Sequence, residues 1–586
     1  MIRLSLIRFA RSPRPDAAFR RWLFLGKTPA LEAACVTAMP PDQRIDVTQD
    51  LLEIADRLRP EFAREVARIG AEQTDILGWH SSTFAWKTPA ASDLFLLSCY
   101  RLLIRKLAVE HSEPTLIFLE DSWLYEDCRR DDDLQKVVAE STPADLSVDK
   151  ALLALRGVAG RILWIGRTAV SWTRQRLHAG RRDIAASGKA KYAVYSMPHA
   201  RCFGPGGKWH DPFLPGLEAL ILRAGGEVLR FVPPDVYGFE RELAQRSDFV
   251  RPLILDAPLR ELAAAVATVW RPQSLSTYAL EGVSMPLLAE REWWTDAGSA
   301  RWCGYRLFDT CFRRYREREK PMAVTYPYEN QPWEKIICAA SSKTGTTTIA
   351  YQHSVVPRFF LGYWPGPEGR GTPLPDRIVA SGPLQRELLI QAGTPAAKTL
   401  VGGSMRFRYL ASVSGRRQSR RPGNSRVLVI ANHSLPVTQG IIDAVRAAFP
   451  DHGLKDALEF FFRPHPTSAP GSTRDVAGLT TVKGDLSSQL PDFDLIVATG
   501  STVALEACFL GVPVILYRPA LFLDTMDPGN LVPKGYFEYA TAPEMRERVL
   551  RCLTEPRDTA SNTGGLRDAL FSPVDEQVWL RCLRGG

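Results

Sequence analysis

The chain has 586 residues, of which 45% are hydrophobic and 24% are charged, so it is a folded protein too long for a single hydrophobic core. Its net charge of +9 favours anionic partners. The ten cysteines form no C-x-x-C pair, which argues against a cysteine-bound zinc ion. Because arginines interrupt the apolar amino terminus and no apolar run reaches about 18 residues, we expect neither a secretory signal nor a spanning helix, and a cytoplasmic protein.

The first part of the chain, residues 1–150, alternates short apolar runs with helical patterns. Two runs are predicted as buried strands, ALEAACVTAM (30–39) and PTLIFLED (114–121). Between and after them, longer stretches repeat their apolar residues at helical spacing. The sequence therefore predicts an N-terminal α/β region.

Residues 151–190 form a basic stretch, predicted as an amphipathic helical linker. Five arginines interrupt its apolar residues at helical intervals: Arg156, Arg161, Arg167, Arg174 and Arg176. One interpretation is a solvated helix packed on the core. The other is a peripheral contact between residues 151–182 and an anionic membrane surface, which would place the protein at the inner face of the cytoplasmic membrane.

Two further α/β domains are predicted after the linker, each with strands that alternate with helices as in a doubly wound parallel sheet. The Gly/Pro-rich stretch 362–375 is the strongest boundary signal between them. We therefore expect one Rossmann-like domain at 191–372, a second at 373–550, and closing helices at 551–586. Two such domains would face each other across a cleft.

The strand LEFFF (458–462) in the last domain ends in Arg463-Pro464-His465-Pro466. Proline cannot donate to a sheet ladder and favours an extended residue before it, so the two prolines should hold His465 just past the strand's carboxyl end. Open α/β sheets bind ligands at this edge. We expect Arg463 and His465 to take part in phosphate binding.

A second strand end, Gly500-Ser501-Thr502, precedes a helix. A helix amino terminus presents unpaired N–H groups and a partial positive charge, so these residues are predicted to bind phosphate, with Glu506 available to ribose hydroxyls. Simple helix capping is the alternative role for Ser501 and Thr502. Since about 35 residues separate this strand end from His465, we expect the two on adjacent strands around one phosphate.

The R-P-H-P strand end, the T-G-S-T-x-x-x-E helix start and the following G-V-P-V-I resemble the nucleotide-binding half of GT-B glycosyltransferases. The pairing of His-Pro with Ser-Thr is most similar to bacterial sialyltransferases and 3-deoxy-manno-octulosonate (Kdo) transferases, which use CMP-activated sugars. TYPYENQPWEK (325–335) and TIAYQHS (348–354) further resemble bacterial surface-carbohydrate biosynthesis proteins. The resemblance covers residues 190–545.

This resemblance implies roles for individual residues. His465 would contact the leaving phosphate and serve as general acid, with Ser501 and Thr502 on the same phosphate. A protonated imidazole and a helix amino terminus would stabilise the charge that builds as the phosphate leaves. This route needs neither a metal nor a cofactor beyond the nucleotide sugar, and no D-x-D dyad stands in a suitable setting.

The middle domain places further polar residues at predicted strand ends. Glu329 and Asn330 end one strand, with Glu334 in the first turn of the helix that follows, and Gln352 and His353 end the next. We expect Glu329 to act in catalysis as a base or in substrate binding, and the other four residues to bind substrate. Surface acids at a helix start, and a satisfied buried histidine, are the structural alternatives.

Two more aspartates compete for the role of base or nucleophile at the acceptor. Asp211 lies in the glycine-rich loop GPGGKWHD before a helix, and Asp121 ends the buried strand 114–121. We favour Asp211 as catalytic because its loop precedes the first helix of the middle domain, and assign Asp121 to substrate binding.

Together these patterns predict a metal-independent GT-B glycosyltransferase. It would move an acidic keto-sugar of the Kdo or sialic type from a CMP donor to a bacterial surface polysaccharide or lipopolysaccharide. The partners would be the donor and a glycan or lipid-linked glycan acceptor, with no nucleic acid. A CDP-polyol phosphotransferase of the same fold and a non-catalytic nucleotide-sugar-binding assembly protein are the alternatives.

Overall fold

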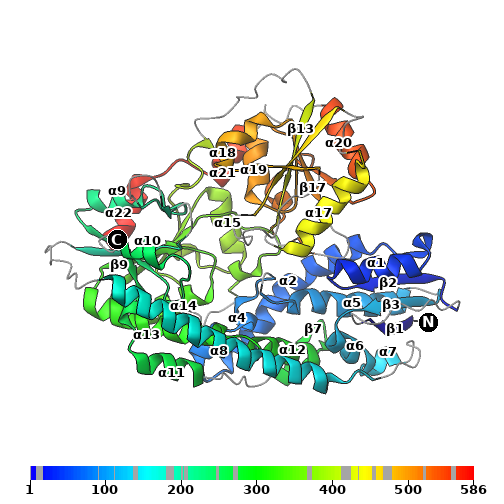
Figure 1. Cartoon of the computed structure of the whole chain (residues 1–586), viewed down its shortest axis with the longest axis horizontal. Coiled ribbons are helices and arrows are strands. Elements are labelled where there is room, and N and C mark those ends of the chain that lie inside the picture. The colour runs from blue at the N-terminus through cyan, green and yellow to red at the C-terminus, as the bar shows by residue number, and fades with distance from the viewer. Residues whose placement is uncertain are drawn as a thin grey trace.

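The chain folds into three α/β units, each built on its own parallel sheet (Figure 1). In Figure 1 the N-terminal and middle units lie side by side, and the C-terminal unit lies above them. The α/β class and the two larger parallel sheets agree with the prediction from sequence.

The computed structural model describes residues 2–585 except 8–17, 90, 111–112, 136–142, 180–189, 199–201, 204–208, 246–249, 268–274, 366–372, 411–423, 433, 452–456, 466–477, 519–522, 525 and 556–562.

The N-terminal unit has a three-stranded sheet with the order β1-β3-β2. The run at 114–121 supplies the buried central strand, as predicted, but the run at 30–39 is helix α1 and not a strand. Pro29 begins this helix, and alanine, leucine and glutamate favour helix over sheet. The elements are β1 (Ile2–Leu6), β2 (Arg21–Leu25), β3 (Thr115–Leu119), α1 (Pro29–Ala38), α2 (Thr48–Ala71), α3 (Ile76–His80), α4 (Thr83–Trp86), α5 (Leu94–Glu110), α6 (Ser122–Arg129) and α7 (Asp132–Gln135).

Helix α8 (Leu146–Ala179) follows and confirms the helix predicted in the basic stretch. With 34 residues it is about 50 Å long. It lies along the outside of the N-terminal and middle units, against α10, α11 and α12 (Figure 1). Residues 180–189, the rest of the predicted linker, lie outside the described residues.

The middle unit is a seven-stranded parallel sheet with the order β12-β11-β10-β9-β4-β5-β6. Its strands are β4 (Lys191–Tyr195), β5 (Glu227–Val232), β6 (Val250–Pro252), β9 (Ala323–Pro327), β10 (Thr347–Gln352), β11 (Arg377–Ala380) and β12 (Thr399–Val401). Its helices are α9 (Leu217–Arg223), α10 (Glu240–Gln245), α11 (Leu259–Ala267), α13 (Arg301–Glu319), α14 (Pro332–Ser341) and α15 (Pro383–Gln391). The hairpin β7 (Ala279–Leu280) and β8 (Val283–Ser284) and helix α12 (Pro286–Ala297) come from the same stretch of chain but pack on α2, α4, α5 and α6 of the N-terminal unit.

The predicted boundary between residues 372 and 373 is wrong, because β11 and β12 beyond it belong to the middle sheet. Gln352 of β10 lies opposite Ala380 of β11 in a parallel ladder. Glycine and proline favour a loop wherever they cluster, and here the loop joins two neighbouring strands of one sheet. The change from one sheet to the next falls between β12 and β13.

The C-terminal unit is a six-stranded parallel sheet with the order β15-β14-β13-β16-β17-β18. Strand β13 lies between β14 and β16, so the ends that carry His465 and Ser501 are not adjacent, contrary to the expectation, and their strands lie roughly 10 Å apart. The elements are β13 (Ser425–Ile430), β14 (Leu458–Arg463), β15 (Thr480–Thr481), β16 (Leu495–Ala498), β17 (Val514–Tyr517), β18 (Glu538–Ala540), α17 (Leu435–Ala448), α18 (Leu486–Gln489), α19 (Thr502–Phe509) and α20 (Met545–Thr554).

The last two helices, α21 (Thr563–Leu570) and α22 (Glu576–Leu583), return to the middle unit. Trp579 of α22 is buried against Tyr192 and Tyr351 of the middle sheet, and its Nε1 donates to the Gly402 carbonyl at 3.0 Å. The segment predicted as closing helices is therefore helical. It covers the middle sheet and so ties the C-terminal unit to it.

A shared hydrophobic core joins the N-terminal unit to the rest of the molecule. Side chains of α2 and α5 pack in it with Leu288 of α12, Phe359 after β10 and Leu523 after β17. The N-terminal unit therefore has a fixed position next to both larger sheets. No described helix combines the length and apolar character needed to cross a membrane.

Candidate functional site

The predicted site residues fall on the carboxyl edges of the two larger sheets. Glu329 and His353 follow β9 and β10 of the middle sheet, whereas His465 and Ser501 follow β14 and β16 of the C-terminal sheet. All strands of each sheet are parallel, so each set shares one edge. The two edges differ in how their polar groups are partnered.

At the end of β14, Arg463 is bound to its own unit. Its Nη1 donates to the Val482 carbonyl at 3.0 Å and its Nη2 to the Gly484 carbonyl at 2.7 Å. The guanidinium thus holds the segment after β15 against β14. His465, half-buried two residues further, remains the candidate ligand-binding side chain of this strand end, and Pro466 lies outside the described residues.

The end of β13 separates this strand end from β16. Buried Asn432, just after β13, donates from Nδ2 to the Thr499 hydroxyl at 2.9 Å, and its backbone N–H donates to the Thr438 hydroxyl at 3.0 Å. The amide therefore links the ends of β13 and β16. A ligand that touches both His465 and Ser501 would have to pass over Asn432.

At the end of β16, Ser501 is the N-cap of helix α19 and accepts a hydrogen bond from the Val503 N–H at 3.2 Å. Thr502 is the first, buried residue of the helix. The Glu506 carboxylate, about one turn further, accepts a hydrogen bond from the Tyr409 hydroxyl. Capping is thus one function of Ser501, and Glu506 holds the segment after β12 to this helix.

A carboxylate of the chain itself lies where a phosphate was expected. The Gly500 N–H donates to Asp524 Oδ2 at 2.5 Å. A Cβ at position 500 would lie 2.3 Å from the Met526 carbonyl carbon and 2.4 Å from Asp524 Oδ1, so only glycine allows this close approach. An anionic ligand at Gly500 would have to displace Asp524 or bind beside it.

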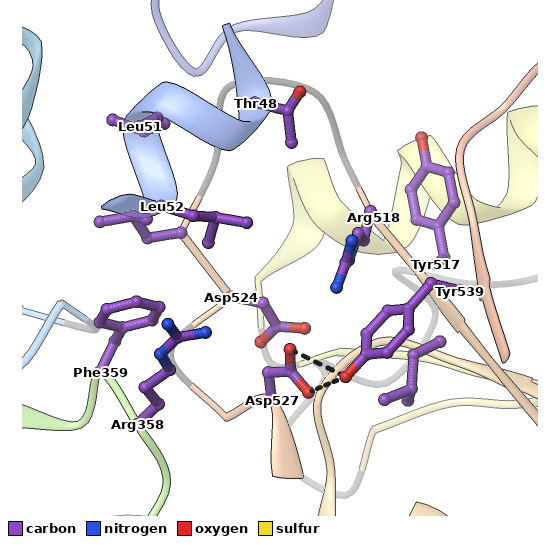
Figure 2. Close-up of a pocket in the computed structure, with 12 residues that line it drawn as sticks. Thr48, Leu51, Leu52, Arg358, Phe359, Tyr517, Arg518, Asp524, Asp527 and Tyr539 are labelled. Atoms are coloured by element: carbon purple, nitrogen blue, oxygen red, sulfur yellow. Dashed lines mark hydrogen bonds between the residues drawn. The ribbon is translucent and has the colours of Figure 1, made fainter. Parts of the chain in front are cut away.

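Asp524 belongs to a cleft at the carboxyl end of β17, where all three units meet. Figure 2 shows that α2 forms one wall with Thr48, Leu51 and Leu52, while Arg358 and Phe359 enter from the loop after β10 and Arg518 and Tyr539 from the C-terminal sheet. A wider cavity of about 760 Å³, open to solvent, shares Arg358, Arg518, Asp527 and Tyr539 with it. Ligand sites of small molecules commonly occupy about 300–1,000 Å³, so the cleft can hold a nucleotide.

Two guanidinium groups flank the carboxylates of this cleft (Figure 2). The Arg518 guanidinium carbon lies 3.7 Å from the centre of the Tyr539 ring, and Arg358 donates from Nε to Asp56 of α2 at 2.5 Å. Burial lowers the pKa of Arg358 and of neighbouring Arg59, whose Nη1 donates to the Arg358 carbonyl at 2.8 Å. An anionic ligand would replace hydration that these cations have lost.

The acids of the cleft are held in a partly desolvated state. Burial, reinforced by the nearby charge of Asp527, raises the pKa of the Asp524 carboxyl to about 6. Burial also raises the pKa of Asp527, which accepts hydrogen bonds from the Gly529 N–H at 2.7 Å and from the Tyr539 hydroxyl at 3.2 Å. The charge inside the cleft therefore changes near neutral pH.

The middle edge brings Glu329 and His353 together. His353 Nε2 lies 3.6 Å from Glu329 Oε1, and Gln331 donates from Nε2 to Glu329 Oε2 at 2.5 Å. Burial, assisted by the positive charge of Arg406, lowers the pKa of His353 to about 3, and burial raises the pKa of Glu329. At neutral pH the imidazole is therefore neutral and faces a carboxylate that takes up a proton more readily than usual.

Three other predicted substrate-binding residues are hydrogen-bonded within the middle unit. Glu334 accepts from the N–H groups of Glu329, Asn330 and Gln331 at 2.9 to 3.1 Å and so caps α14. Asn330 has a positive φ of 57° and donates from Nδ2 to the Gly362 carbonyl at 2.9 Å. Gln352 accepts from the N–H and hydroxyl of Ser381, both at 3.0 Å. These contacts shape the edge and support Glu329.

The two competing aspartates both serve as turn or helix caps. Asp211 is buried at this same edge, where it accepts from the Ser196 hydroxyl at 2.7 Å and from the N–H groups of Phe213 and Leu214 at 3.0 Å. Asp121 caps α6 in the N-terminal unit and accepts from Arg291 Nε at 2.6 Å. Asp121 therefore belongs to neither large sheet edge. Asp211 lies at the end of β4, next to β9, the strand that leads to Glu329.

Four residues of this cleft, Arg358, Arg518, Asp527 and Tyr539, were not predicted from the sequence, and only Arg518 had a recognisable pattern. Arg518 directly follows the buried strand PVILY, much as Arg463 ends β14, and could have been singled out on that ground. Arg358, Asp527 and Tyr539 reach the cleft only through tertiary packing. Within the described ranges, histidine, cysteine and acidic side chains form no cluster suited to a metal ion.

No family model matches the sequence, and a comparison with curated proteins gives no match. Several solved structures resemble the chain. UDP-GlcNAc 2-epimerase from Neisseria meningitidis bound to UDP-GlcNAc is 11% identical, covers 68% of this chain and 100% of its own, and gives a TM-score of 0.41. The glycotransferase of kitacinnamycin is 15% identical over 68% and 97%, with a TM-score of 0.37. Anabaena Alr3699/HepE in complex with UDP and glucose is 15% identical over 68% and 98%, with a TM-score of 0.36. Likeness at this level assigns no ligand or residue role to this chain.

Proposed function

We propose that the chain is a glycosyltransferase of the GT-B type whose donor nucleotide binds in the cleft at the carboxyl end of β17. One observation carries this proposal: Arg358 and Arg518, from different units, flank a cavity of nucleotide size that adjoins the smaller pocket of Asp524, the carboxylate bound to the Gly500 N–H. Open parallel sheets bind their ligands at this edge. Arginine is also the side chain best suited to phosphate, because its planar donors match phosphate oxygens.

The leaving group would be stabilised from this edge. As the bond between the sugar and the nucleoside phosphate breaks, negative charge builds on the phosphate. Arg358 and Arg518 would stabilise that charge more strongly in the transition state than in the bound donor. A protonated His465, three strands away at the end of β14, would add its positive charge to the same sheet edge. We expect neither a metal nor a further cofactor.

The acceptor would be activated from the middle edge. Glu329 combines a raised pKa with a side chain that is still 28% exposed, so it can reach a ligand and accept its proton. The neutral imidazole of His353 can orient the same hydroxyl. Asp211, Asn330, Glu334 and Gln352 would position this pair through the contacts described above, and Asp121 would act only indirectly, through Arg291.

The finer proposal concerns the substrates. The donor is a CMP-activated acidic keto-sugar, and the acceptor is a glycan or lipid-linked glycan of a bacterial surface polysaccharide, reached at the inner face of the cytoplasmic membrane. The R-P-H-P strand end and the Ser501-Thr502 helix start support the CMP donor by resemblance. A CDP-polyol phosphotransferase would use the same phosphate-binding groups, so the nucleotide decides between the two.

Calorimetry on the full chain with CMP, CDP and UDP tests the proposal. We expect CMP to bind at least tenfold more tightly than UDP; a preference for CDP would favour the polyol-phosphate alternative, and no binding of any of the three would refute the transferase assignment. His465→Ala should lower turnover at least about tenfold if the imidazole stabilises the leaving phosphate. Unchanged turnover in this variant would reduce His465 to a structural turn residue.

A further inference from the structure

Many apolar side chains of helix α8 point toward solvent instead of toward the protein core. Eight of the sixteen large hydrophobic side chains that are exposed in the described chain belong to this one helix. They are Val148, Leu152, Leu155, Val158, Ile162, Leu163, Val170 and Leu177. Exposed hydrophobic residues scattered singly need no explanation, but a contiguous row of them marks an interaction surface.

The row follows one face of the helix. Six of the eight, Val148, Leu152, Leu155, Ile162, Val170 and Leu177, lie with Ala159, Gly166 and Thr173 at positions three or four residues apart, the spacing of a single stripe on an α-helix. Leu155 is 67% exposed, Ile162 63% and Leu177 78%, so the stripe is open along its whole length. We call it the outer stripe of α8.

The opposite face, which packs on the N-terminal and middle units, combines small and polar residues with the large side chains of Trp164, Ile165 and Trp172. A Cβ at Gly157 would lie 2.3 Å from the Ala297 carbonyl oxygen, so the helix backbone approaches α12 closely here. Further along, buried Thr168 shares a hydrogen bond of 2.9 Å with the Tyr237 hydroxyl, and Ser171 donates to the Val236 carbonyl at 3.3 Å. The helix is therefore anchored through its inner face, and the core does not use the exposed aliphatic residues.

From Lys150 onward, all lysine, arginine, aspartate and glutamate positions of helix α8 are basic. From Lys150 to Ala179 the sequence contains no aspartate or glutamate but five arginines. Four of these are exposed, Arg156, Arg167, Arg174 and Arg176. The first three lie seven or eleven residues apart, which puts them along one border of the outer stripe. An apolar stripe bordered by cations suits a surface with a hydrocarbon interior and anionic headgroups.

We propose that the outer stripe of α8 docks the protein on an anionic membrane surface, with the helix lying in the plane of the headgroups. The aliphatic side chains enter the boundary between headgroups and acyl chains, and the bordering arginines contact lipid phosphates. Charge complementarity favours this occupant over a second copy of the chain, because two such faces would bring like charges together. The inference rests on α8 alone and is independent of the proposed transferase chemistry.

Vesicle flotation tests the docking. The full chain is mixed with vesicles of phosphatidylcholine or of phosphatidylcholine with phosphatidylglycerol, and the bound fraction is measured without any activity assay. We expect binding to the anionic vesicles and at least tenfold weaker binding to the neutral ones. The double variant Leu155→Glu/Ile162→Glu should lose at least tenfold in partitioning, and Arg156→Gln/Arg167→Gln/Arg174→Gln about a hundredfold on anionic vesicles at low salt.

The matched control is Leu222→Glu, an exposed leucine of α9 outside the stripe, 57% exposed, which should bind as the wild type does. Far-ultraviolet circular dichroism and thermal unfolding show whether each variant is folded. The proposal is overturned if the wild-type protein binds neither vesicle type. So does a wild-type dimer in light scattering that the double glutamate variant converts to a monomer, since the stripe would then cover a second copy.

Discussion

The carboxyl edges of the two large sheets carry similar polar residues but use them differently. At the middle edge, hydrogen bonds within the chain hold Glu334, Asn330, Gln352 and Asp211, and Glu329 is paired with His353. At the C-terminal edge, arginines and acids of three units line an open cleft. A ligand can therefore add contacts at the second edge without breaking the framework that shapes the first.

The difference follows from what covers each edge. The loops after β9 and β10 fold over the middle edge and bury His353 to 5% exposure. Helix α2 of the N-terminal unit stands across from β17 and leaves a cavity between them (Figure 2). The N-terminal unit thus contributes one wall of the candidate site, which no pattern in the sequence predicted.

The largest expected effect comes from removing the two flanking cations. Arg358→Gln/Arg518→Gln should weaken nucleotide binding about a hundredfold, because each charged hydrogen bond to phosphate contributes about 1.5–3 kcal/mol. Calorimetry with the tightest-binding nucleotide measures the change. Arg260→Gln, at an exposed arginine on α11 with a side chain 78% exposed, is the matched control and should bind normally. If the double variant binds like the control, the nucleotide lies elsewhere.

The second prediction concerns stability at the middle edge. The folded pKa of His353 is about 3, below its unfolded value of about 6.5, so unfolding takes up a proton. The stabilising contribution is complete above pH 6.5 and is lost as the pH falls toward 3. Between pH 6.5 and 5 the loss is about 2 kcal/mol, at about 1.36 kcal/mol per pKa unit.

Urea unfolding at these two pH values measures that loss in the wild type and in His353→Gln. The variant should lose about 2 kcal/mol less, since glutamine does not titrate. His210→Gln, at an exposed histidine, should retain the wild-type pH dependence. Identical pH dependence in all three proteins would show that His353 is not held neutral by burial.

Much of this arrangement could be read from the sequence, because strand ends are local features. The ends of β14 and β16 lie where the Pro-His-Pro and Gly-Ser-Thr patterns indicated, and Glu329 and His353 do share one edge. The order of strands could not be read, since β13 enters between β14 and β16 through packing of the whole sheet. The contact between Arg358 and Asp56 joins residues 302 positions apart and leaves no local pattern.

The third prediction tests whether Asp524 competes with the ligand. Asp524→Asn removes a negative charge beside Gly500 and should tighten nucleotide binding about tenfold at pH 7.5. Because the pKa of Asp524 is about 6, wild-type binding should also tighten as the pH falls from 7.5 to 5. The variant lacks that titration and so corrects for protonation of the nucleotide itself. Weaker binding by the variant would mean that Asp524 contacts the ligand directly.

The smallest expected effect on nucleotide binding comes from the middle edge. Glu329→Gln keeps the size of the side chain and its hydrogen bond with Gln331, but it cannot accept a proton. The nucleotide affinity should stay within about twofold of the wild type, while kcat should fall at least about tenfold if Glu329 is the base for the acceptor. An unchanged affinity together with a lower kcat is informative, because a defect in folding or in the shared core would change both nucleotide affinity and kcat. A variant that loses nucleotide affinity instead would show that the two edges form one continuous binding site, in which the covered middle edge opens when the nucleotide binds.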